Sequence, residues 1–170
     1  MSDFDVSDPE DTEKFLFKHI AGSLSFLPYG ALVDHFQHWV YENPEVSPKK
    51  RKEKWLELES IYMPYRSYDE MVFIKDGGVW QGQLHIYQMP FYYIDYTLAQ
   101  TCAFQFWIKN EKDSKSAWKD YLTLCQAGGS LSFVNLVKLA KLNSPFEDGC
   151  LEDVVKYVEK WLEDFDIKNM

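Results

Sequence analysis

The stretch from Gln83 to Gln100 constrains this chain most, because an apolar helical pattern begins inside it directly after a proline. From there, apolar residues recur every three or four positions, at Phe91, Ile94, Leu98, Cys102 and Phe106. Pro90 suits the first turn of a helix, where its missing N–H would have no partner in any case. The pattern therefore predicts a helix that starts near Pro90.

A histidine and three tyrosines lie in the same stretch. His85 comes a few residues before Tyr92, Tyr93 and Tyr96. Helical geometry turns Tyr93 and Tyr96 away from the apolar stripe. Two interpretations remain open. The tyrosines are either core residues with hydrogen-bonded hydroxyls, or their hydroxyls and the imidazole are donors directed at developing negative charge.

Helical periodicity continues along the rest of the chain and predicts an all-α fold of about seven helices. The expected helices run over residues 9–25, 28–42, 48–61, 90–109, 115–127, 133–140 and 149–162. Pro28 and Tyr29 are expected to open the second helix, and Asp148 to cap the last one. Residues 110–114 are expected to form a polar loop. Residues 71–74 form a short strand or a helical turn, closed by Asp76-Gly77-Gly78.

Domain organisation follows from composition along the chain. Residues 1–11 are rich in Asp, Ser and Glu and are expected to form a flexible acidic arm. Residues 12–170 contain no low-complexity linker and no repeat, so a single helical domain is expected there. A chain of 170 residues is long enough to bury a core of its own.

Charge and cysteine usage exclude several function classes. A formal net charge of −9 and a pI near 4.9 argue against a surface for nucleic acid or for anionic membranes. The three cysteines show no Cys-x-x-Cys spacing, which is typical of a reducing compartment. Since neither a signal peptide nor a membrane-length apolar run is visible, we expect a cytoplasmic chain.

The segment from His85 to Tyr96 reads His-Ile-Tyr-Gln-Met-Pro-Phe-Tyr-Tyr-Ile-Asp-Tyr. With Phe26–Tyr41 and Ser144–Gly149, it resembles the C-terminal part of the oligoendopeptidase F and thimet oligopeptidase family of zinc metallopeptidases. The resemblance covers nearly the whole chain beyond about residue 15. It implies part of a helical catalytic domain and hydrolysis of short peptides, with zinc as the cofactor of the complete enzyme.

The zinc-binding motif of that family is missing from this chain. The family holds zinc with a His-Glu-x-x-His helix, but no glutamate follows any of the four histidines, His19, His35, His38 and His85. We therefore expect no metal ligands in this chain and no activity by the chain alone. The missing ligands would come from a zinc-bearing part that is joined covalently or associates as a partner chain, and self-association of this chain is a further expectation.

The resemblance also implies a role for the central stretch. By resemblance, His85, Tyr92, Tyr93 and Tyr96 would hydrogen-bond the peptide backbone and the tetrahedral oxyanion from across the cleft. Two positions depart from the family pattern: Gly82 stands where arginine is usual, and Gln88 stands where glutamate is usual.

Two alternative functions remain open. In the first, the chain is a non-catalytic helical module that binds peptides or a partner through His85, Tyr93 and Tyr96. In the second, it is an independent metalloenzyme that uses His35, His38 and His85. His35 and His38 are one helical turn apart, but no third or fourth ligand is obvious beside them.

Overall fold

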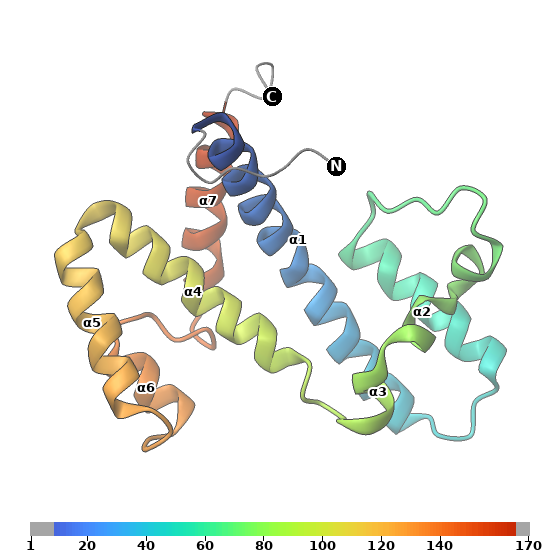
Figure 1. Cartoon of the computed structure of the whole chain (residues 1–170). Coiled ribbons are helices and arrows are strands. Elements are labelled where there is room, and N and C mark those ends of the chain that lie inside the picture. The colour runs from blue at the N-terminus through green and yellow to red at the C-terminus, as the bar shows by residue number, and fades with distance from the viewer. Residues whose placement is uncertain (1–8, 166–170) are drawn as a thin grey trace. The chain divides into compact units, whose positions relative to one another are not determined.

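The computed structural model describes residues 9–165, which form helices joined by turns and loops (Figure 1). The α-helices are α1 (Pro9–Glu42), α2 (Pro48–Tyr62), α3 (Leu84–Gln88), α4 (Ile94–Lys112), α5 (Ser114–Ala127), α6 (Phe133–Leu139) and α7 (Cys150–Glu163). A π-helical segment, η1 (Ile74–Gly78), and a 3₁₀ segment, η2 (Val79–Gly82), precede α3. No strand occurs within residues 9–165, so the predicted all-α fold is confirmed.

The chain divides into two compact units. One is residues 25–97, and the other combines the described residues of Met1–Leu24 and Leu98–Met170. The single helical domain expected over residues 12–170 stays a prediction. The expected acidic arm falls mainly on residues 1–8, outside the described residues, and residues 9–11 already belong to α1.

Pro28 does not open a helix, so that prediction is wrong. α1 runs without interruption from Pro9 to Glu42 with Pro28 inside it. Proline in a helix interior removes one hydrogen bond, here to the carbonyl of Leu24, and crowds the preceding turn. The helix continues because residues on both sides of Pro28, such as Leu27 and Leu32, are buried. Their burial offsets the local cost of the proline.

Two other helix boundaries differ from the prediction. The polar loop expected at 110–114 is a single residue, Asp113, because α4 extends to Lys112 and α5 begins at Ser114. The Asp113 carboxylate accepts a hydrogen bond from the Ser116 N–H at 3.1 Å and caps α5. Asp148 does not cap α7. The residue before that helix is Gly149, whose φ of +84° is one that glycine adopts readily.

The turn predicted at Asp76-Gly77-Gly78 lies within η1, and residues 72–73 are helical rather than extended. Gly77 has a φ of +85°, and a Cβ atom there would collide with the carbonyl oxygen of Lys52. Because α2 and η1 pack this closely, only glycine fits. A salt bridge of 2.8 Å between Lys52 Nζ and Asp76 Oδ2 joins the same two elements.

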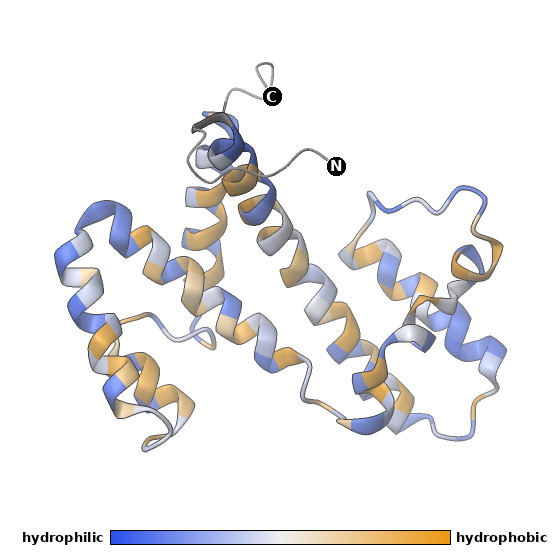
Figure 2. Cartoon of the chain, viewed as in Figure 1, coloured by the Kyte–Doolittle hydropathy of each residue, from blue (hydrophilic) through white to orange (hydrophobic). Residues whose placement is uncertain are grey.

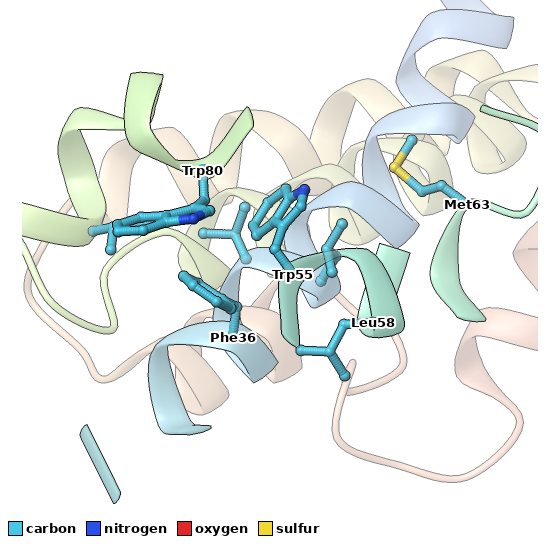
Figure 3. Packing of buried hydrophobic residues seen from close by; sticks show 8 residues of the cluster. Phe36, Trp55, Leu58, Met63 and Trp80 are labelled. Atoms are coloured by element: carbon cyan, nitrogen blue, oxygen red, sulfur yellow. The ribbon is translucent and has the colours of Figure 1, made fainter. Parts of the chain in front are cut away.

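The unit formed by residues 25–97 is built around an aromatic core (Figure 3). The rings of Phe36 and Trp55 meet edge to face at 5.2 Å, and the rings of Phe36 and Trp80 are also 5.2 Å apart. The buried members come from α1, α2, the residue that follows α2, η2 and α3, and they comprise Leu32, Val33, Phe36, Trp55, Leu58, Met63, Trp80 and Ile86. Burial of Ile86 anchors the short α3, which also carries His85.

The other unit contains α4 from Leu98 onward, α5, α6 and α7, together with α1 as far as Leu24. α5 and α6 pack against each other (Figure 1), and the ring of Trp107 on α4 meets the rings of Tyr157 and Trp161 on α7 edge to face at 5.6 and 5.5 Å. Hydrophobic and hydrophilic residues alternate along α7 at helical intervals (Figure 2). Val154 and Val158 on its apolar face are buried, as the sequence pattern predicts. None of the helices within residues 9–165 is long and apolar enough to cross a membrane.

A buried carboxylate joins three elements of this unit. Asp120 on α5 accepts hydrogen bonds of 2.8 Å from Lys109 on α4 and from Lys141, which follows α6. These two ammonium groups lower the pKa of Asp120 to about 2. Asp120 therefore stays ionised throughout the neutral range and holds both lysines in place.

We expect stability to depend on the ionisation of Asp120 at acid pH. A carboxylate whose pKa is depressed in the folded state stabilises the fold above its unfolded pKa of about 4. This contribution is lost as pH falls through the folded pKa of about 2. Urea unfolding at pH 7, 4 and 3 should show a steeper loss of stability for the wild-type chain than for Asp120→Asn.

The matched control is Asp148→Asn, which removes an exposed carboxylate. It should keep the acid dependence of the wild-type chain. Parallel curves for Asp120→Asn and the wild-type chain would contradict the assignment of this pH dependence to Asp120.

Candidate functional site

Pro90 lies in the turn between α3 and α4, so the helix start predicted there is wrong. α3 ends at Gln88 and α4 begins at Ile94. Phe91 has a φ of +61°, a left-handed conformation that interrupts a right-handed helix. The Phe91 N–H donates a hydrogen bond of 2.8 Å to Oε1 of Gln37 on α1. This contact fixes the turn and thereby the start of α4.

Gln37 is fully buried and was not predicted from the sequence. The sequence does contain a signal, because Gln37 lies four residues after the apolar Val33 and directly after the apolar Phe36 in a helical pattern. A polar residue on the buried side of a helix indicates a specific hydrogen bond. Here that bond spans 54 residues of sequence and sets the geometry of the site below.

The structure brings together all four predicted site residues. The ring of His85 on α3 stacks on Tyr92, with centroids 6.0 Å apart and planes at 9°. The same imidazole meets Tyr93 at 5.3 Å and Tyr96 at 5.7 Å, both edge to face. Tyr96 also lies 5.4 Å from Tyr92 and 5.6 Å from Tyr93. The four rings thus form one cluster at the turn between α3 and α4.

A cavity of about 420 Å³ opens beside this cluster. It is lined by Phe26, Gly82, Gln83, Leu84, His85, Tyr93 and Tyr96. Leu84 is 60% exposed and Tyr96 is 42% exposed, so the cavity is open to solvent. Phe26 was not expected here, because only the tertiary fold places α1 beside the turn, whereas Gln83 and Leu84 directly precede His85 in the sequence. Tyr92 supports the cluster from outside the lining.

The hydroxyls of Tyr93 and Tyr96 remain protonated at neutral pH, because the pKa of each is raised. Burial raises the pKa of Tyr93, although a side-chain hydrogen bond with Gln83 acts in the opposite direction. A hydrogen bond with Tyr92 raises the pKa of Tyr96, and partial burial adds to this. Behind them, burial raises the pKa of Tyr29 to about 12, and its ring meets Tyr93 edge to face at 5.9 Å. The cavity wall therefore presents neutral O–H groups.

The remaining histidines have separate partners. His35 Nδ1 lies 3.1 Å from the hydroxyl of Tyr62. His38 Nε2 lies 3.5 Å from Asp34, and its ring packs on Phe91 at 4.7 Å. The structure does not place His35, His38 and His85 as ligands of a common metal. Each contacts a different set of side chains.

The donor set of the site does not fit zinc. Zinc in proteins is held by imidazole, thiolate and carboxylate groups, whereas the rings around His85 are phenols. Across the described part of the chain, no three His, Cys, Asp or Glu side chains gather as a metal-binding group. The arrangement suits hydrogen bonding to a ligand.

Comparisons with known proteins point in one direction. The model of Peptidase family M3 matches residues 7–155. A 3.1 Å crystal structure of an oligoendopeptidase F shares 52% identity with this chain at a TM-score of 0.91. PZ peptidase A with inhibitor 2 shares 55% sequence identity with this chain at a TM-score of 0.89. An oligoendopeptidase F from Bacillus anthracis str. Ames shares 44% identity at a TM-score of 0.78.

The first oligoendopeptidase F and the Bacillus anthracis structure each align with 95% of this chain, and PZ peptidase A aligns with 92% of it. The aligned part is 28% of the first oligoendopeptidase F chain, 28% of PZ peptidase A and 26% of the Bacillus anthracis chain. This chain therefore spans only about a quarter of the length of these structures. A search of curated proteins gave no match.

Proposed function

The chain belongs to peptidase family M3, as the resemblance to the oligoendopeptidase F and thimet oligopeptidase family predicts, and we propose that it forms the substrate-cleft portion of a zinc oligoendopeptidase. In this proposal it supplies hydrogen-bond donors to a short peptide. The zinc ligands come from another part of the enzyme, either a zinc-bearing partner chain or a portion joined covalently. We also propose that this chain self-associates and that the enzyme is located in the cytoplasm.

The observation that carries this proposal is the convergence of His85, Tyr93 and Tyr96 on one open cavity. Hydrolysis of a peptide bond develops negative charge on the carbonyl oxygen. Donors about 3 Å from that oxygen stabilise the transition state by about 2.7–4 kcal/mol each. The two phenols are suited to this because they stay neutral and keep their protons. Tyr92 positions His85 by stacking and Tyr96 by a hydrogen bond.

Of the two departures from the family pattern, Gly82 lies in the lining of this cavity and Gln88 lies outside it. A Cβ atom on Gly82 would meet nothing within 4 Å, so the backbone here leaves room for the first atom of a side chain. Gln88 lies at the end of α3 and is exposed. The cavity therefore offers uncharged donors, and the guanidinium and carboxylate usual at these two positions are replaced by neutral residues.

A second candidate function is a non-catalytic module that binds peptides in the same cavity. The observation that favours it is the replacement of the usual arginine and glutamate by Gly82 and Gln88, which removes a charge pair that could orient the catalytic groups. Both candidates require peptide binding, and they differ in whether hydrolysis follows when a zinc-bearing portion is present.

Peptide binding tests the requirement that both candidates share. We expect short fluorescein-labelled peptides of mixed sequence to bind the isolated chain. The combined substitutions Tyr93→Phe and Tyr96→Phe should weaken binding by roughly tenfold, since two hydrogen bonds of about 0.5–1.5 kcal/mol each are removed. Fluorescence anisotropy gives the dissociation constants.

The control is Tyr65→Phe, a residue of the same unit that is 64% exposed. It removes one hydroxyl far along the chain from the cluster and should leave affinity unchanged. If the double variant bound peptide as tightly as Tyr65→Phe, both candidate functions of this cavity would be rejected.

A further inference from the structure

A second cavity, of about 600 Å³, lies in the unit that contains α4–α7. Four of the 18 basic residues of the chain line it. Lys109 and Lys112 come from α4, Lys141 follows α6, and Lys156 comes from α7. The chain as a whole carries a formal net charge of −9, whereas the lining of this cavity is rich in positively charged side chains. A cleft lined by one sign of charge concentrates ions of the opposite sign.

Acidic groups offset only part of this charge. The buried carboxylate of Asp120 pairs with Lys109 and Lys141 at 2.8 Å each. Asp153 also lines the cavity, and Glu152 lies 3.8 Å from Lys156. Four ammonium groups thus face three carboxylates, and Glu152 is highly exposed and distant for an ion pair. Positive charge remains in excess inside the cavity.

The backbone around the cavity is held by hydrogen bonds within the chain. The side chain of Gln105 on α4 donates to the carbonyl of Asn143 at 3.0 Å and accepts from its N–H at 2.8 Å. Lys109 Nζ donates to the carbonyl of Ala140 at 3.1 Å. These bonds fix the segment after α6 against α4. A ligand that binds here meets an organised site, which lowers the entropic cost of binding.

Lysine geometry leaves donors available for a ligand. An ammonium group has three N–H donors, and Lys109 uses two of them, for Asp120 and for the Ala140 carbonyl. Lys112 and Lys156 are exposed on the cavity wall. Tyr157 adds a hydroxyl to the same lining. Charge-assisted hydrogen bonds from ammonium groups to an oxyanion are stronger than bonds between neutral groups.

We propose that this lysine-lined cavity binds a small dianionic oxyanion, carried by a phosphate or by a dicarboxylate. Lys112 and Lys156 contact the anion directly, and Asp120 positions Lys109 and Lys141 beside it. The site is separate from the His85 cavity, and its residues play no part in the proposed peptidase function. Failure of either proposal leaves the other unaffected.

Two probes, inorganic phosphate and succinate, test the proposal at neutral pH with ionic strength held constant by sodium chloride. Isothermal titration calorimetry on the whole chain should detect binding of one or both probes. Lys112→Gln combined with Lys156→Gln should weaken binding at least tenfold. The control, Lys115→Gln combined with Lys119→Gln, removes the same charge from exposed positions on α5 and should retain wild-type affinity.

Either probe binding with this dependence on Lys112 and Lys156 supports the proposal and identifies the preferred anion. Equal affinities of the two double variants, or no heat of binding beyond that of chloride, would overturn it. Lys156→Gln alone, at a side chain that is 72% exposed, provides the same comparison against Lys115→Gln if the double variant does not fold.

Discussion

Phe36→Ala is expected to destabilise the unit of residues 25–97 by about 3–5 kcal/mol, the usual cost of removing a buried phenylalanine ring. Phe36 is fully buried, and its ring contacts those of Trp39, Trp55 and Trp80. Small domains are stable by only about 5–15 kcal/mol, so this one substitution removes a large part of the total. Urea unfolding followed by tryptophan fluorescence measures the change directly.

Ile61→Ala is the control for this prediction. Ile61 lies on α2 in the same unit and is 66% exposed, so its truncation should cost well under 1 kcal/mol, as is usual for surface positions. The loss of stability in Phe36→Leu should lie between those of Phe36→Ala and Ile61→Ala, because leucine fills most of the space that the phenylalanine ring occupies. If Phe36→Ala were as stable as Ile61→Ala, the core in Figure 3 would not be the main source of stability.

Tyr96→Phe is expected to lower the turnover of a reconstituted enzyme by about 10²–10³-fold, as loss of one oxyanion donor does. The enzyme is a chimaera in which this chain replaces the matching 28% of PZ peptidase A, with which it shares 55% identity. The loss should be larger in kcat/KM than in kcat, with KM raised a few-fold, because the hydrogen bond already forms to the bound peptide and strengthens in the transition state. Hydrolysis of a fluorogenic short peptide provides the measurement.

Tyr93→Phe should behave similarly, and Tyr65→Phe should retain the activity of the chimaera. A change of less than threefold for both Tyr93→Phe and Tyr96→Phe would contradict the role proposed for these hydroxyls. A chimaera that binds peptide and zinc but does not hydrolyse peptide would favour the non-catalytic binding module.

The sequence alone determined the fold class and the composition of the central cluster. Apolar residues at helical spacing specify helices regardless of what they pack against, and local caps mark several ends, as with Ser47, which accepts from the Lys50 N–H at 3.3 Å at the start of α2. His85 and the three tyrosines are neighbours in sequence. A single turn suffices to bring their rings together.

Only the tertiary structure decided what each proline does. Pro28 and Pro90 carry the same local signal for a helix start, because both lack an N–H and have a fixed φ. Burial of Leu27 before Pro28 and of Leu32 after it keeps α1 continuous. After Pro90, the hydrogen bond from the Phe91 N–H to the Gln37 side chain holds Phe91 in a left-handed backbone conformation. As a result, α4 begins at Ile94 and not at Pro90.

The lining of both cavities was likewise decided by tertiary contacts. Phe26 reaches the His85 cavity from α1, and Lys109, Lys141 and Lys156 come from separate elements. Helical periodicity reports which face of a segment is apolar, but it carries no information on which other segment that face meets. Helices are determined by contacts over three or four residues, whereas cavities are determined by contacts between residues tens of positions apart.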